Sequence, residues 1–143
     1  MIIDSHCHLN YDPLINSIPE IIKRAEDNGI KYMLTISTKD KEFADILDLV
    51  NKYENIYGTY GIHPHEANSH EKITVDTIIN NIKKNNKIIG IGETGLDFYY
   101  NNSKKNIQID LFTRHIEASI ETNKPIIVHT RNAENETYDV LKK

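Results

Sequence analysis

The sequence predicts an α/β protein in which helices cover a parallel β-sheet. Short apolar runs of strand-like composition alternate five times with amphipathic segments of helical periodicity. Strand–helix–strand units of this kind connect parallel strands through right-handed crossovers. The chain has 143 residues, 38% of them hydrophobic and 27% charged, so we expect a single domain over residues 1–143 with a core of its own.

Local signals mark the first strand and the first helix. Residues 1–8 begin apolar and end polar, which indicates a strand. Ser17 and Glu20 have the S-x-x-E spacing of a capping box, so a helix is predicted to begin there. Gly29 is predicted to end this helix, because glycine tolerates the left-handed conformation found at helix C-termini.

Periodicity predicts the remaining elements. Apolar residues spaced i, i+3, i+4 and i+7 mark helices, and short runs rich in β-branched residues mark strands. The predicted strands cover residues 32–37, 56–62, 88–91 and 126–128, and the predicted helices include residues 43–50, 75–82 and 109–120, with a last helix from near residue 135. The polar segments 68–73 and 99–106 are predicted to be loops.

Charge and cysteine content indicate the compartment and the class of partner. The net charge of −4 gives no support for a basic DNA-binding face, although bound divalent cations would reverse the local field. Cys7 is the single cysteine, which is typical of a reducing compartment, and we expect a cytoplasmic protein. The sequence has no apolar run long enough to span a bilayer and no signal-peptide pattern, so no membrane association is expected.

His6 and His8 flank Cys7 at the end of the first predicted strand. Residues i and i+2 of a strand point to the same side, so both imidazoles share a face, and Cys7 points away and packs. Two neutral imidazoles side by side suit a borderline cation such as zinc. The motif alone leaves open the alternative of two polar residues at a strand end that bind nothing.

Residues 90–95 match the G-x-G-x-x-G pattern and follow a strand. A dinucleotide site requires the last glycine to open a helix, whose N-terminus binds the pyrophosphate. Residues 96–102 make a poor helix start and the unit is the fourth in the chain, so this interpretation is disfavoured. The alternative is that the glycines allow a tight backbone turn while Glu93 points into a site, where a carboxylate can bridge two cations.

Three further histidines lie at predicted strand ends. His129 ends the fifth strand and shares a face with Arg131, although His129 considered alone could be a surface histidine. His63 and His65 follow the third strand, and Pro64 restricts His63 to extended geometry. The two histidines either hold a substrate phosphate or orient a ligand, or Pro64 simply terminates the strand. All these candidates lie at the carboxyl ends of strands, where parallel α/β folds place their sites.

Four ordered motifs resemble the TatD-type metal-dependent deoxyribonucleases, which belong to the amidohydrolase-like TIM barrels. The motifs are D-S-H-C-H at 4–8, G-I-H-P-H at 61–65, G-E-T-G-L-D-F-Y at 92–99 and P-I-I-V-H-T-R at 125–131. The resemblance implies a TIM-barrel-type (β/α) fold. It also implies hydrolysis of the phosphodiester bonds of DNA at a site with two divalent cations, which could be zinc, magnesium or manganese.

The resemblance further implies a role for each matched site residue. His6 and His8 would bind one cation, and His129 would bind the second. Glu93 would bridge the two cations and would be the catalytic residue. The contacts to the substrate phosphate would be His63, His65 and Arg131.

The chain departs from this family in length. A complete (β/α)₈ barrel takes about 250 residues, so we expect a barrel truncated to about five of eight β/α units. The family's remaining ligands, a histidine and an aspartate, come from later strands, and no histidine follows His129. Candidate substitute ligands in this chain are Asp4, Asp97 and Glu134.

This shortness leaves other functions open. The chain could be an inactive or partner-dependent fragment, with a second chain supplying the missing strands. It could also be a metal-dependent hydrolase that acts on a phosphomonoester or an amide.

Overall fold

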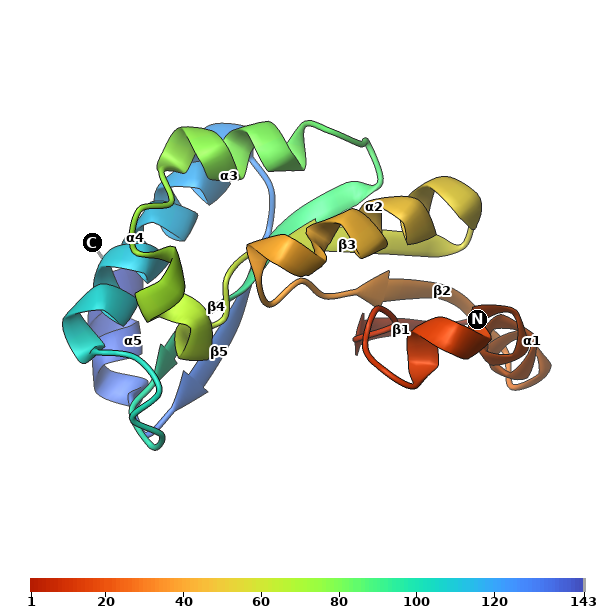
Figure 1. Ribbon diagram of the computed structural model, residues 1–143, viewed down its shortest axis with the longest axis horizontal. Coiled ribbons are helices and arrows are strands. Elements are labelled where there is room, and N and C mark those ends of the chain that lie inside the picture. The colour runs from red at the N-terminus through yellow and green to blue at the C-terminus, as the bar shows by residue number, and fades with distance from the viewer. Residues whose placement is uncertain (143) are drawn as a thin grey trace.

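Five parallel strands form one sheet in the computed structural model, which describes residues 1–142 (Figure 1). Neighbouring strands are consecutive in the sequence, so the order is β1-β2-β3-β4-β5. The strands are β1 (Ile2–Cys7), β2 (Ile30–Thr35), β3 (Ile56–Tyr60), β4 (Ile88–Asp97) and β5 (Ile126–Arg131). The predicted α/β class is confirmed, and the sheet and its helices form a half-barrel.

Each strand is followed by a helix, as the alternating pattern predicts. The α-helices are α1 (Ile18–Asp27), α2 (Phe43–Lys52), α3 (Val75–Ile82), α4 (Lys105–Thr122) and α5 (Glu134–Leu141). Short 3-10 helices are η1 (Leu14–Ser17), η2 (Asp40–Glu42) and η3 (Pro64–His70). Within residues 1–142, no helix combines the length and the apolar character needed to cross a bilayer.

The main core lies between the sheet and the helices. Ile46 of α2 and Ile78 of α3 pack against Ile56, Tyr60 and Ile88 of the strands, and all five side chains are inaccessible to solvent. Burying an apolar side chain of this size contributes about 1.5–3 kcal/mol to stability. The helical spacing of the apolar residues therefore fixes which face of each helix meets the sheet.

The opposite face of the sheet carries exposed apolar side chains. Ile3 of β1, Tyr32 of β2 and Ile89 of β4 are 54%, 40% and 37% exposed. They line an apolar hollow of about 350 Å³ on this face.

Some local predictions were wrong in detail. Ser17 is the N-cap of α1, but its side chain makes no capping bond. Helix η1 runs directly into α1, and the Ser17 hydroxyl faces the carbonyl oxygen of Leu14 at 3.5 Å instead. The segment predicted as a loop from residue 68 begins inside η3.

Gly95 lets β4 and β5 approach closely. Its φ of +139° is a conformation that side chains with a Cβ rarely adopt, and a Cβ there would lie 2.0 Å from the carbonyl oxygen of His129. Only glycine therefore fits this position without a shift of the backbone. Gly29, which ends α1 as predicted, also has a positive φ of +80°, but no atom lies within 4 Å of its Cβ position.

His115 of α4 connects this helix to the end of β3 and is fully buried. Its Nε2 accepts the N–H of Ile62 at 3.2 Å, and its Nδ1–H donates to the carbonyl oxygen of Leu111 at 2.8 Å. These two bonds require the neutral ring with the proton on Nδ1. Burial is the main reason why the pKa of His115 falls from 6.5 to about 4, and the charge of Arg114 adds to it.

Folding stability should therefore fall as the pH drops from about 6.5 to about 4. The unfolded chain binds a proton at His115 in this interval and the folded chain does not, so the contribution is complete above pH 6.5 and is lost below it. The shift corresponds to about 3 kcal/mol. Urea unfolding at pH 7 and pH 4.5 should show a smaller pH dependence for His115→Gln than for the unsubstituted chain, and equal pH dependences would contradict the prediction.

Candidate metal centre

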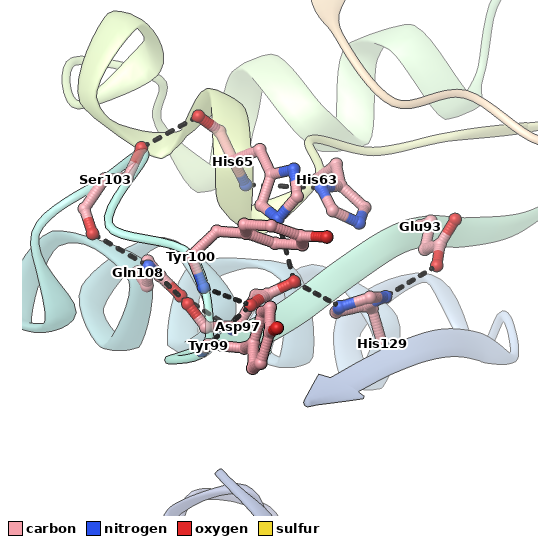
Figure 2. Close-up of polar contacts among 9 residues, drawn as sticks. All are labelled: His63, His65, Glu93, Asp97, Tyr99, Tyr100, Ser103, Gln108 and His129. Carbon is pink, nitrogen blue, oxygen red and sulfur yellow. Dashed lines mark hydrogen bonds and ion pairs between the residues drawn. The ribbon is translucent and has the colours of Figure 1, made fainter. Parts of the chain in front are cut away.

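Predicted site residues lie together toward the carboxyl ends of the strands. Figure 2 shows His63, Glu93 and His129, which come from the end of β3, from β4 and from β5. The ligand atoms form two groups, and within each group they all lie within 4.8 Å of one another. The first group is His6, His8 and Glu93, and the second group is His63, Glu93 and His129.

The first group has ring orientations suited to a cation. His6 Nε2 lies 3.4 Å from Glu93 Oε2. His8 Nδ1–H donates to the carbonyl oxygen of Ile36 at 3.0 Å, which leaves the lone pair of Nε2 free in the neutral ring. A backbone carbonyl holding the second ring nitrogen is typical of metal-binding histidines. The ring of Tyr11 stacks on His8 with the centroids 4.9 Å apart and restricts its plane.

Cys7 takes no part in either group. Its thiol donates to the carbonyl oxygen of Leu34 at 3.3 Å, and its side chain packs against the core. Burial, with a smaller contribution from Asp4, raises the pKa of the Cys7 thiol to about 12. The side chain is thus a protonated thiol at neutral pH, which is a poor metal ligand.

A β-bulge directs Glu93 into the site. The register between β4 and β5 shifts between Ile91 and Thr94, where β4 has one more residue than β5. Such bulges bend a strand and re-aim a side chain. The N–H of Glu93 donates to the carbonyl oxygen of Ser37 at 2.7 Å. The Thr59 hydroxyl donates to the carbonyl oxygen of Gly92, the residue before Glu93, at 2.5 Å. Both bonds hold the bulge in place.

The two carboxylate oxygens of Glu93 face different imidazoles. Oε2 faces His6, and Oε1 lies 3.3 Å from Nδ1 of His129. Burial raises the pKa of Glu93, but the neighbouring rings of His129, His63 and His6 outweigh this effect, so the pKa lies below its usual value. Glu93 is therefore ionised at neutral pH and offers one oxygen to each group.

His63 differs from the other members of the second group. Its Nδ1 accepts the N–H of His65 at 3.2 Å, so the proton of the neutral ring lies on Nε2. Burial, followed by the charge of His129, lowers the pKa of His63 to about 4, which keeps the ring neutral at pH 7. An Nε2–H group donates hydrogen bonds, so His63 suits an anionic oxygen better than a cation.

The other two predicted substrate contacts lie at the rim of the second group. His65 Nε2 is 2.7 Å from Asp97 Oδ2, and the rings of His65 and Tyr100 form a T-shaped pair with centroids 5.3 Å apart. The exposed guanidinium of Arg131 lies over the rings of Tyr99 and Tyr100, at 4.1 and 4.7 Å from their centroids. The structure thus brings His63 and His65 close to the predicted metal ligands, whereas Arg131 packs on the rings of Tyr99 and Tyr100.

Asp97 belongs to the site in a way that sequence reasoning missed. β4 extends to Asp97 instead of ending at residue 91, because it pairs with β5 as far as Arg131. Asp97 is 1% exposed, and its carboxylate contacts the rings of both His65 and His129. Its spacing from Glu93, four residues along an apolar strand, was the signal available in the sequence. Asp97 lies outside both groups of ligand atoms.

The donor set fits divalent cations of intermediate hardness. Imidazole nitrogens together with a carboxylate suit zinc, manganese and related ions. The described residues offer at most three ligands to each group, of which Glu93 is shared. Structural zinc sites have four protein ligands, whereas catalytic sites keep positions open for water or substrate. With at most three ligands at each group, the described residues fill fewer positions than a structural zinc site requires.

A parallel β/α half-barrel with histidine and carboxylate groups at the carboxyl ends of its strands has the architecture of the metal-binding β/α-barrel enzymes. Residues 3–143 match the family described as TatD related DNase, and the chain belongs to this family. The resemblance noted from the four sequence motifs is thereby confirmed.

Individual relatives agree with this assignment. A protein of Buchnera aphidicola subsp. Acyrthosiphon pisum is 40% identical over 149 residues, covering 99% of this chain and 56% of the relative. YcfH of Escherichia coli is 32% identical over 144 residues, covering 99% of this chain and 53% of YcfH. Both relatives are named uncharacterized metal-dependent hydrolases. The chain spans about half the length of the curated relatives it matches.

Two solved structures share the fold. YJJV, a TatD homologue from Escherichia coli, superposes with a TM-score of 0.91 at 24% identity, covering 99% of this chain and 55% of YJJV. A TatD family hydrolase from Entamoeba histolytica gives a TM-score of 0.88 at 24% identity, covering 99% of this chain and 53% of that protein. The half-barrel is thus part of a known barrel architecture.

Proposed function

We propose that this chain contributes to a metal-dependent hydrolase that cleaves the phosphodiester bonds of DNA with two divalent cations. The observation that carries the proposal is the Glu93 carboxylate, which faces His6 with one oxygen at 3.4 Å and His129 with the other at 3.3 Å. A carboxylate in this position can serve two cations at once. The family's description as TatD related DNase supports DNA as the substrate.

The side chains of such a site would have different roles. His6 and His8 would hold one cation, His129 the other, and Glu93 both. When bound, zinc, magnesium or manganese would supply the positive charge that activates water and neutralises the phosphate during its hydrolysis. His63 is neutral and carries its proton on Nε2, so it can donate a hydrogen bond to a phosphate oxygen.

The proposed rim contacts are His65 and Arg131. Arg131 is a fixed positive charge, and the rings of Tyr99 and Tyr100 hold it beside the second group. A planar guanidinium is suited to phosphate oxygens because it offers paired donors. We propose the cytoplasm as the compartment, which the lone protonated thiol of Cys7 supports.

We further propose that a partner chain supplies strands that cover the open face of the half-barrel. Ile3, Tyr32 and Ile89 expose apolar surface on that face, and the curated relatives continue well beyond the matched region. Burial of this surface would stabilise the complex, and the added strands would supply further ligands.

A DNA cleavage assay tests this function. The chain is assayed alone and together with the part of YcfH that follows the matched region. We expect cleavage that EDTA abolishes and that manganese, magnesium or zinc restores, with the higher rate in the mixture.

Parallel assays with p-nitrophenyl phosphate and an amide substrate separate the alternatives. Turnover of one of these alone would replace DNA as the substrate. If the folded, metal-loaded mixture turned over none of the three, the proposal of an enzyme would be wrong.

A further inference from the structure

We propose that Asp97 is a positioning residue that holds the proton of His129 on Nε2, so that His129 presents its Nδ1 lone pair to a cation. The inference rests on the proposed cation site, since it assigns a function to a group that acts through one of the ligands. Asp97 would have no contact with substrate or with the reacting atoms.

The contacts of Asp97 Oδ2 carry the argument (Figure 2). This oxygen lies 3.0 Å from Nε2 of His129 and 2.7 Å from Nε2 of His65. An ionised carboxylate only accepts hydrogen bonds, so both Nε2 atoms must donate. A neutral His129 ring with its proton on Nε2 has its lone pair on Nδ1, and this atom is the one that faces Glu93 at 3.3 Å.

The second oxygen of Asp97 is also engaged. Oδ1 accepts the backbone N–H groups of Tyr99 at 3.1 Å and of Tyr100 at 3.2 Å. Both oxygens therefore accept two hydrogen bonds each, and the residue is 1% exposed. Asp97 has no free oxygen for a cation, so it acts through His129.

The backbone of Asp97 is fixed from α4. The Gln108 side chain is 1% exposed, accepts the N–H of Asp97 at 2.8 Å and donates to its carbonyl oxygen at 3.1 Å. The same Gln108 amide donates to the carbonyl oxygen of Ser103 at 2.9 Å. Because the buried Gln108 amide bonds both backbone groups of Asp97, it fixes the position of the Asp97 carboxylate relative to β5.

The two ligand groups then differ in how their histidines are held. His8 donates its second ring nitrogen to the neutral carbonyl of Ile36, whereas His129 donates to the charged carboxylate of Asp97. A carboxylate partner makes an imidazole a more basic ligand, and such partners change metal affinity by about 10–100-fold. The cation held by His129 should therefore depend on Asp97, and the cation held by His6 and His8 should not.

Asp97→Asn tests the contribution of Oδ2, the carboxylate oxygen that faces His65 and His129. Asparagine keeps an oxygen for the N–H groups of Tyr99 and Tyr100, an arrangement that its side chain favours in turns. It then presents an amide N–H₂ to His129 and His65, which removes their acceptor. We expect Co²⁺ titrations in the His8→Ala background, where the first group has lost a ligand, to show binding about 10–100-fold weaker for Asp97→Asn.

The controls separate positioning from a role in holding the loop. Asp110→Asn makes the same chemical change on the exposed face of α4 and should leave Co²⁺ affinity unchanged. Asp97→Ala removes the loop contacts as well as the histidine contacts. Asp97→Asn should bind Co²⁺ as weakly as Asp97→Ala, and wild-type affinity of Asp97→Asn would overturn the proposal.

Ring ¹⁵N NMR of the Zn²⁺-loaded, unsubstituted chain tests the proposal even if the variants do not fold. We expect the proton of His129 on Nε2 and the Zn²⁺-bound signature on Nδ1. The reverse assignment would overturn the proposal. Neither readout involves DNA, so failure to cleave DNA would affect the proposed function and not this inference. If the unsubstituted chain bound neither ion, both would be wrong.

Discussion

Glu93→Gln should weaken cation binding at both ligand groups at once. The Glu93 carboxylate is the one residue common to the two groups, and an amide lacks its charge and its second acceptor oxygen. Substitution of a residue that hydrogen-bonds to a metal ligand lowers metal affinity about 10–100-fold. Loss of the shared ligand itself should therefore lower the affinity for Mn²⁺ by more than about 100-fold. Isothermal titration calorimetry with Mn²⁺ measures this directly.

Glu117→Gln is the matched control, because Glu117 is an exposed residue of α4. It should bind Mn²⁺ like the unsubstituted chain. His6→Ala should weaken only the first group. Retention of one full-affinity site by Glu93→Gln would show that the two groups do not share this carboxylate.

Gly95→Ala should cause the largest loss of stability of any alanine substitution at a glycine discussed above. Its backbone has φ of +139°, and the added Cβ would lie 2.0 Å from the carbonyl oxygen of His129. Such a backbone conformation costs about 1–3 kcal/mol for a residue other than glycine, and the steric overlap adds to it. We expect a loss of at least about 3 kcal/mol, which lowers the Tm by about 10 °C.

Gly29→Ala provides the comparison in a thermal unfolding experiment. Its φ is +80° with no atom within 4 Å of the new Cβ, so only the backbone penalty of about 1 kcal/mol applies. Similar Tm values for the two variants would mean that β4 and β5 can separate at Gly95 at little cost.

Much of the fold could be predicted because it depends on local patterns. The spacing of apolar residues located α1 to α4, and short apolar runs located the strands. Strand ends gave the candidate ligands, since a parallel sheet brings the carboxyl ends of its strands to one edge. The roles of the individual ligands and the single domain over residues 1–143 stay predictions.

The bulge in β4 and the role of Asp97 depend on contacts between segments that lie far apart in the sequence, so sequence patterns do not predict them. The bulge at Glu93 arises from the pairing of β4 with β5, and the length of β4 depends on the same partner. The role of Asp97 requires His65, His129 and Gln108 to meet around it, although each lies on a different element. The periodicity of one segment contains no information about contacts between side chains of different elements.

In the proposed metal-bound state, the position of the ligands would also link metal supply to the lifetime of the folded chain. His6 lies on β1 and His129 on β5, the two outer strands of the sheet, which do not pair with each other among the described residues. Cations shared through Glu93 would act as a noncovalent cross-link between these outer strands. A ligand that binds only the folded state stabilises it by about 2.7 kcal/mol at a hundred times its Kd. A cell short of divalent cations would then contain less of this protein, because the metal-free chain would unfold and be degraded more often.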